Sequence, residues 1–215
     1  MNDIVIFGAG GLGREVACLI KRINVVCPQW NLIGFFDDGI PVGTKNEYGT
    51  ILGNVQDIAK NEKPLAVAVA IGAPKTVKKI VDILSVNPNL VFPNLISPDL
   101  SIADPDNYEI GYGNIIQRNC TVSCNVRIGN FNLLNTGVGF GHDAKVGDYN
   151  SFMPAVKISG GTVIGDCNFF GVGSIVLQQL TVGNGIKLGA GSLLMRNAKD
   201  DTLYVGSPAK KIEIG

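Results

Sequence analysis

The chain has 215 residues, and its 18 lysine and arginine residues balance 18 aspartate and glutamate residues, so its formal net charge is zero. A zero net charge excludes the strong basic field that gathers nucleic acid or an anionic membrane surface. Only 17% of the residues are charged and 28 are glycine, which excludes a helical bundle and a disordered chain and indicates many tight turns on a repeating frame. The single histidine, His142, excludes a site built from two or three imidazoles.

The N-terminal segment predicts a strand, a glycine turn and a helix. Ile4–Phe7 is a short apolar run that leads straight into the sequence GAGGLG, unlike a secretory signal peptide. Gly8, Gly10 and Gly13 match the pattern G-x-G-x-x-G, and the residues after them have the apolar periodicity of a helix. Such a turn lets the backbone approach a ligand closely, and the N–H groups at the start of the helix attract an anion.

A second apolar run, Leu32–Phe36, ends in two acidic residues, Asp37 and Asp38. A carboxylate at about this distance after a glycine turn is where a ribose is bound in nucleotide-binding folds. The alternative is a solvated turn.

A third apolar run, Leu65–Ile71, ends at Gly72, and residues 75–84 predict another helix. A full dinucleotide fold needs two mononucleotide halves, and this part of the chain has room for one. We therefore predict an α/β, Rossmann-like mononucleotide-binding domain over residues 1–94. Four prolines mark a stiff junction around its end: Pro88, Pro93, Pro98 and Pro105.

An 18-residue repeat dominates residues 95–215. An aliphatic residue followed by glycine recurs at that spacing at Ile110-Gly111, Ile128-Gly129, Val146-Gly147, Ile164-Gly165 and Val182-Gly183. Within this repeat a large apolar residue returns every six positions from Ile110 to Leu194, and the position two before it is Asn at 114, 132, 150 and 168.

A six-residue period predicts a short strand with a turn, and three such units form a triangular coil. We expect five coils between about Ile110 and Lys199, with the periodic apolar residues inside and the four asparagines stacked in a ladder. Leucine-rich repeats have a longer unit, and helical repeats are opposed by the frequent glycine.

The five cysteines are odd in number and belong to a chain that is not small, so we expect reduced thiols in a cytoplasmic protein. Cys120 and Cys124 have the spacing of a metal pair, but no second pair or second histidine completes four ligands, and we predict no metal. No apolar run approaches the ~20 residues of a membrane span.

This pattern resembles the hexapeptide-repeat, left-handed parallel β-helix family. Within it, the chain is similar to the bacterial nucleotide-sugar N-acetyltransferases, the subfamily of UDP-N-acetylbacillosamine N-acetyltransferase and the sialic acid O-acetyltransferase-like proteins. The resemblance rests on GAGGLG at 8–13, FDD at 36–38, AIG at 70–72, GHD at 141–143 and VGSPAK at 205–210. It implies the left hand of the β-helix, acetyl-CoA as co-substrate, a homotrimer with the coenzyme groove between neighbours, and no required metal.

The resemblance also implies roles for individual residues. His142 takes the proton from a sugar amine as the amine attacks the acetyl thioester, and Asp143, where the family often has glutamate, raises the basicity of the imidazole. The backbone N–H of Gly160 faces the acetyl carbonyl. Acetyl-CoA is expected at Ser151, Gly160, Val172 and Ala190, although the family commonly has histidine where this chain has Ser151. The nucleotide sugar is expected at Gly10, Gly11, Leu12, Asp37, Asp38 and Gly72.

Lys210 and Lys211 either meet the coenzyme phosphates or form a solvated basic tail. The predicted activity is direct acetyl transfer to the 4-amino group of a UDP-, dTDP- or GDP-linked amino-deoxysugar. Alternatives are O-acetylation of sialic acid or a related sugar, a zinc carbonic anhydrase, which would need three histidines, and a non-catalytic nucleotide-sugar-binding protein. We expect no nucleic acid and no membrane as partners.

Overall fold

A computed structural model describes residues 1–212. The chain divides into two compact units, Met1–Pro98 and a second unit that starts at Asp99, so the division falls inside the proline-rich junction. Among the helices of residues 1–212, none combines the length and the apolar character that crossing a membrane requires.

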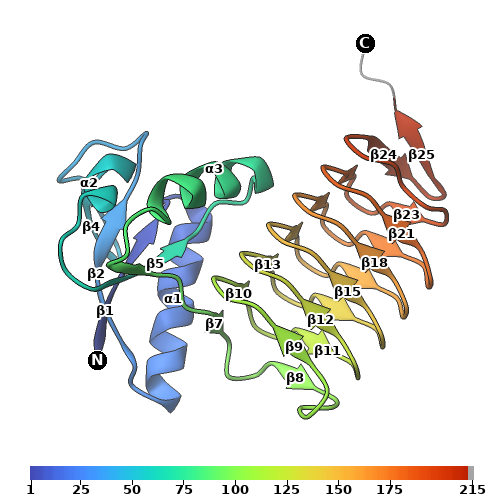
Figure 1. Ribbon diagram of the computed structural model, residues 1–215, viewed down its shortest axis with the longest axis horizontal. Coiled ribbons are helices and arrows are strands. Elements are labelled where there is room, and N and C mark those ends of the chain that lie inside the picture. Colours follow the sequence, from blue (N-terminus) through green and yellow to red (C-terminus); the bar gives the residue numbers. More distant parts are fainter. Residues whose placement is uncertain (213–215) are drawn as a thin grey trace. The chain divides into compact units, whose positions relative to one another are not determined.

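Unit 1 is an α/β sandwich around a six-stranded sheet of order β3-β4-β2-β1-β5-β6 (Figure 1). The strands are β1 (Asn2–Phe7), β2 (Trp30–Phe36), β3 (Lys45–Asn46), β4 (Gly49–Gly53), β5 (Leu65–Val69) and β6 (Leu90–Val91). The helices are α1 (Gly11–Val26), α2 (Val55–Ala59) and α3 (Pro74–Leu84), and a short strand β7 (Leu95–Ile96) follows β6. All strand pairs are parallel except β3 with β4.

The central strands of unit 1 are apolar throughout because helices cover a parallel sheet on both faces. Residues 4–7 of β1 and all of β5 are buried, and α1 buries Val16, Leu19 and Ile20 on one face. The three predicted strands and both predicted helices are present. Strands β3 and β4 and helix α2 lie in residues 45–59, where the sequence has no marked periodicity, and were not predicted.

The order of strands fixes where a ligand has access to unit 1. Strand β1 lies between β2 and β5, so the connections leaving the sheet at its carboxyl end diverge to opposite sides. In open α/β sheets ligands bind in the crevice at such a switch point. The glycine turn after β1 and Gly72 after β5 lie there.

Unit 2 is a three-sided parallel β-helix, as the repeat predicts. Face A holds β10 (Ile115–Ile116), β13 (Leu133–Leu134), β16 (Ser151–Phe152), β19 (Phe169–Phe170), β22 (Lys187–Leu188) and β24 (Leu203–Gly206). Face B holds β8 (Ser101–Ile102), β11 (Thr121–Val122), β14 (Gly139–Phe140), β17 (Lys157–Ile158), β20 (Ile175–Val176) and β23 (Leu193–Leu194). Face C holds β9 (Glu109–Ile110), β12 (Arg127–Ile128), β15 (Lys145–Val146), β18 (Val163–Ile164) and β21 (Thr181–Val182). A last strand, β25 (Ala209–Ile212), pairs antiparallel with β24.

The interior of unit 2 follows the predicted register. Phe140 pairs with Ile158, 18 residues later, and the other coils repeat this offset. All periodic apolar residues from Ile116 to Leu194 are buried, whereas Ile110 in the first coil is half-buried. The β-helix extends further than predicted, because paired strands already begin at Ser101 and the β24–β25 hairpin follows the last repeat.

The four asparagines form the predicted ladder. The Nδ2 of Asn132 donates to Oδ1 of Asn114 at 3.2 Å, and the Nδ2 of Asn150 donates to Oδ1 of Asn132 at 3.1 Å. The backbone N–H of Asn168 donates to Oδ1 of Asn150 at 2.9 Å. These bonds satisfy the side-chain amides of Asn132 and Asn150, which would otherwise be costly to bury, whereas the buried Nδ2 of Asn168 has no partner among the described residues.

Cys120 and Cys124, which have the spacing of a metal pair, lie in two different environments. Cys120 is buried inside the β-helix, where desolvation raises the pKa of its thiol to about 11, while Cys124 is exposed on the outside. Because the two side chains lie in different environments, they do not form a metal pair. Within residues 1–212 no group of three or more histidine, cysteine or acidic side chains is arranged to hold a metal ion.

Candidate active site

His142 lies on an exposed edge of the β-helix. The turns that lead from face B to face C form this edge, here called edge BC, and comprise residues 123–126, 141–144, 159–162 and 177–180. The imidazole Nδ1 lies 2.8 Å from Oδ2 of Asp143, and the side chain of His142 is 65% exposed. Because a carboxylate only accepts, Nδ1 carries the proton in the neutral ring, and Nε2 keeps a lone pair.

Asp143 is held from a second side by the coil below. It has the left-handed φ of 60°, and so does Asn125 at 55°, 18 residues earlier on the same edge. The Nδ2 of Asn125 donates to Oδ1 of Asp143 at 2.6 Å. The hydrogen bond to His142 and then that to Asn125 lower the pKa of the Asp143 carboxyl. His142, Asp143 and Asn125 therefore form a connected set with a carboxylate at its centre.

Removing the amide of Asn125 is expected to raise the pKa of Asp143. A hydrogen bond donated to a carboxylate favours its charged form, so its loss moves the pKa upward. The measurement is the carboxyl-carbon chemical shift of Asp143 followed against pH by NMR in Asn125→Ala. Gln179→Ala is the matched control, since Gln179 also has a left-handed φ on edge BC and has no bond to Asp143. An unchanged pKa in Asn125→Ala would contradict the assigned contact.

Gly160 lies against the imidazole one coil above. A Cβ added to Gly160 would come 2.5 Å from Nε2 of His142, so only glycine leaves the ring in its present position. The carbonyl of His142 accepts a hydrogen bond from the N–H of Gly161 at 2.7 Å. Among the described residues, none accepts a hydrogen bond from the N–H of Gly160. An imidazole and a glycine whose backbone N–H has no acceptor among the described residues thus lie next to one another, an arrangement suited to acyl transfer.

The residues expected at acetyl-CoA are divided between two parts of the prism. Val172 and Ala190 lie on the edge between faces A and B, edge AB, in neighbouring coils joined by the bond from Gly191 N–H to the carbonyl of Val172 at 2.8 Å. Both are exposed. Ser151 lies in β16 on face A and is buried, so it does not share that open edge. A single chain therefore brings Gly160 to His142 but does not bring Val172 and Ala190 there.

A basic pocket lies at the end of unit 2. It has a volume of ≈ 510 Å³, and its lining includes Arg196, Tyr204, Lys210 and Lys211. The turn of edge AB at Gly189 packs under this hairpin, because a Cβ on Gly189 would lie 3.1 Å from Val205. The two lysines thus line a cavity next to the edge that carries Val172 and Ala190.

In unit 1 the glycines of the turn divide into two kinds. A Cβ on Gly13 would lie 1.9 Å from the carbonyl oxygen of Gly8, and Gly8 itself has a φ of +101°, so these two are required by the fold. A Cβ on Gly10, Gly11 or Gly72 would meet nothing within 4 Å. These three leave open space at the switch point. Leu12 is half-buried in the first turn of α1.

Asp37 and Asp38 both bind backbone N–H groups of neighbouring segments. Asp37 accepts from the N–H of Ala9 in the glycine turn at 2.9 Å and from Gly39 at 2.8 Å. Asp38 accepts from the N–H of Val55 at the start of α2 at 2.9 Å. The carboxylates therefore connect the loops after β1, β2 and β4, and Asp37 is brought to the glycine turn as predicted for a nucleotide site.

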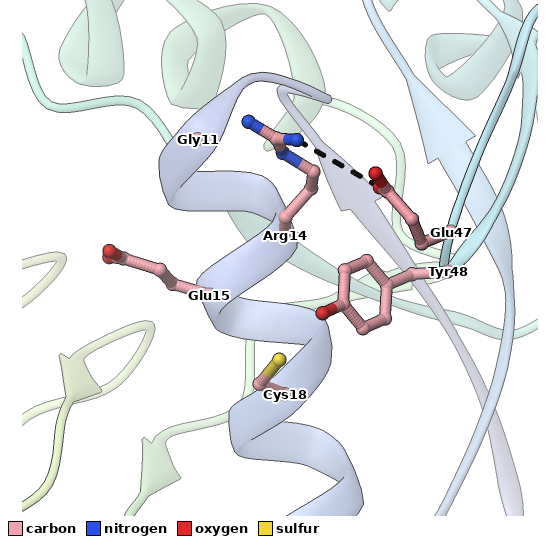
Figure 2. Close-up of a pocket in the computed structure, with 6 residues that line it drawn as sticks. All are labelled: Gly11, Arg14, Glu15, Cys18, Glu47 and Tyr48. Carbon is pink, nitrogen blue, oxygen red and sulfur yellow. Dashed lines mark ion pairs between the residues drawn. The ribbon is translucent and has the colours of Figure 1, made fainter.

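Sequence reasoning missed a pocket beside the glycine turn (Figure 2). It has a volume of ≈ 370 Å³, and α1 contributes Gly11, Arg14 and Cys18 while the segment before β4 contributes Glu47 and Tyr48. The guanidinium of Arg14 lies 3.8 Å from the carboxylate of Glu47. A hydrogen bond with Cys18 is the main cause that raises the pKa of Tyr48. The sequence feature that could have indicated this pocket is Arg14, which directly follows the last glycine of the G-x-G-x-x-G pattern.

Comparisons with known proteins cover both units. The family described as PglD N-terminal domain matches residues 3–84. The acetyltransferase domain of PglB from Neisseria gonorrhoeae has 25% sequence identity and a TM-score of 0.88, with 99% of this chain and 100% of that chain covered. The same domain is known in complex with acetyl coenzyme A, at 26% identity and a TM-score of 0.87.

Two further structures have the same fold. WeeI from Acinetobacter baumannii has 27% identity and a TM-score of 0.87 over 99% of this chain and 100% of that chain. PerB from Caulobacter crescentus, in complex with CoA and GDP-perosamine, has 24% identity and a TM-score of 0.87 over 99% of this chain and 98% of that chain. No curated protein has a sequence that matches the chain.

Proposed function

We propose that this chain is a hexapeptide-repeat acyltransferase with a PglD-like N-terminal domain and that it transfers the acetyl group of acetyl-CoA to the amine of a nucleotide-linked amino-sugar. The observation that carries the proposal is the pairing of His142 with Asp143 at 2.8 Å, with Gly160 packed against the same imidazole. The similar structures include an acetyltransferase domain bound to acetyl coenzyme A and a protein bound to CoA and GDP-perosamine.

The reaction needs no covalent intermediate on the enzyme. The amine nitrogen attacks the thioester carbon while Nε2 of His142 removes an amine proton, and Asp143 stabilises the resulting imidazolium. The N–H of Gly160 donates a hydrogen bond to the carbonyl oxygen and stabilises the negative charge that develops there. The carbon–sulfur bond then breaks, the leaving thiolate of CoA receives the proton from the imidazolium, and an amide is formed. Atoms and charges balance without a metal or an oxidant.

A trimer completes the site in this proposal. His142 lies on edge BC, whereas Val172 and Ala190 lie on edge AB. The β-helix of one chain therefore cannot place the residues of both edges against the same coenzyme molecule. Packing edge BC of one chain against edge AB of the next joins the two half-sites, and three chains close such a head-to-tail contact into a ring. The acetyl-CoA groove then lies between neighbouring chains, with the thioester at Gly160.

The coenzyme is oriented by the basic pocket. Edge AB leads from Val172 through Ala190 to the hairpin that carries Lys210 and Lys211, whose pocket of ≈ 510 Å³ also contains Arg196. Cations attract phosphates strongly, so we place the phosphates of CoA at this end. The thioester then points toward the N-terminal coils.

Unit 1 supplies the nucleotide site of the substrate. The open positions Gly10, Gly11 and Gly72 lie at the switch point, and α1 starts at Gly11 without a side-chain cap, which leaves its first N–H groups for the diphosphate. Leu12, Asp37 and Asp38 border the nucleoside. The division of labour proposed is nucleotide-sugar binding by residues 1–94 and acetyl transfer by residues 95–215.

The test is an assay of free thiol released from acetyl-CoA. Purified protein is offered UDP-, dTDP- and GDP-linked 4-amino-sugars, the matching sugars without a 4-amino group, and free sialic acid. Thiol release that requires the 4-amino group, with an acetamide in the product by mass spectrometry, supports the proposal. Release with sialic acid alone would replace it by O-acetylation, and tight binding of a nucleotide sugar without release would replace it by a binding protein.

A further inference from the structure

The first coil of the β-helix is interrupted on the edge that carries the catalytic pair. Ser101 pairs with Thr121, and Glu109 pairs with Arg127. The two residues of the first coil, Ser101 and Glu109, are eight positions apart, whereas their partners in the next coil are six positions apart. The additional residues lie in the loop between β8 and β9, which is visible at the N-terminal end of unit 2 in Figure 1. Every later turn on edge BC keeps the regular length.

The longer loop creates a polar pocket, here called the corner pocket. It is lined chiefly by Asp106, Asn107 and Glu109 of the first coil and by Asn125 and Arg127 of the next, with a volume of ≈ 150 Å³. Glu109 and Arg127 form an ion pair at 3.5 Å, so a cation and an anion lie at the same wall. The space corresponds to about five water molecules, which suits a single sugar ring and excludes a nucleotide.

The corner pocket is connected to the catalytic pair by one residue. Asn125 lines the pocket and donates to Asp143 at 2.6 Å, and Asp143 binds His142. Stacked strands are ~4.8 Å apart, so the pocket starts about one strand spacing from the coil of His142.

The direction of approach also favours this pocket. In the proposed function the coenzyme occupies the coils on the C-terminal side of His142, from Gly160 toward Lys210. The N-terminal side of His142 is then left for the acceptor sugar. The corner pocket is on that side and on the same edge.

We propose that the corner pocket binds the ring hydroxyl groups of the acceptor sugar and thereby selects the sugar. Paired carboxylate, amide and guanidinium groups are suited to vicinal hydroxyls, each of which both donates and accepts a hydrogen bond. The inference rests on the proposed function, since it assigns a subsite to that reaction. It goes beyond it by naming Asp106, Asn107 and Glu109 as specificity residues.

The experiment compares Asp106→Ala and Glu109→Gln with the unaltered protein in steady-state kinetics. A hydrogen bond to a charged group is worth ~1.5–3 kcal/mol, so we expect KM for the nucleotide-linked amino-sugar to rise at least about 10-fold, with KM for acetyl-CoA unchanged. Asp82→Ala is the control, because Asp82 is an exposed residue of α3 that pairs with Lys78 and does not line the corner pocket. Circular dichroism at increasing temperature checks that each variant is folded.

A deoxy-sugar series separates recognition from an indirect effect. If Asp106 binds a hydroxyl, a substrate that lacks this hydroxyl binds the unaltered protein more weakly than the complete substrate does. With Asp106→Ala, removal of the same hydroxyl causes no further loss of affinity, so the two effects are non-additive. Folded variants with unchanged KM for the sugar, or additive losses for every hydroxyl, overturn the subsite. If the unaltered protein releases no thiol with any amino-sugar, the proposed function fails first, so the two failures are distinguishable.

Discussion

Replacing His142 by alanine is expected to leave the protein folded and to lower kcat by at least ~100-fold, the lower range for a general base. The side chain is 65% exposed and packs no core, so its loss removes chemistry and little stability. Nε2 is the ring atom that faces Gly160, and no second histidine is present to replace it. Single-turnover formation of acetamide, followed by mass spectrometry, measures the chemical step.

The matched variant for this prediction is Gln178→Ala. Gln178 occupies the same position of edge BC two coils further along and is exposed. Its kcat should stay within about twofold of the unaltered protein. Near-normal turnover by folded His142→Ala would remove the general base from the mechanism.

Replacing Phe152 by alanine is expected to lower the free energy of unfolding by ~3–5 kcal/mol, the usual cost of removing a buried phenyl group. Phe152 is fully buried and lies between two other aromatic rings, 5.0 Å from the centroid of Phe140 and 4.7 Å from that of Phe170. Its loss opens a cavity across three consecutive coils. Chemical denaturation monitored by circular dichroism gives the free energy.

Val163→Ala is the comparison for Phe152→Ala. Val163 lies on the outer side of face C and is 45% exposed, so its shortening should change the free energy of unfolding by less than about 1 kcal/mol. Equal losses for the two variants would contradict a core organised by the six-residue period. The kinetic constants of a folded Phe152→Ala protein serve as a second readout.

The β-helix was predictable because its physical cause is visible in the sequence. Each coil buries the same position, so a large apolar residue at every sixth place marks the interior from Ile116 to Leu194. The asparagine ladder follows from the same offset, since residues 18 apart stack. Strands β3 and β4 were missed because they are short, polar and set by pairing with β2 rather than by a periodic pattern.

The candidate site was predictable in part. His142 stands out as the single histidine, and Gly160 follows from the 18-residue offset. The same 18-residue offset relates Asn125 to Asp143, so their contact could have been predicted from the sequence, although it was not. Arg14, Tyr48 and the corner pocket depend on how irregular loops fold, and no repeat predicts that geometry.

The constant 18-residue offset restricts how the length of unit 2 can change during evolution. Loss of a whole coil between His142 and Val172 would bring these two residues one coil closer but keep each on its own edge. Loss of six residues would rotate everything beyond the deletion by one third of a turn, and Val172 would then occupy the place of Asp166, between faces C and A. Viable insertions and deletions between these residues should therefore come in whole coils, whereas the first coil tolerates extra residues because they bulge outward without disturbing the pairing on either side.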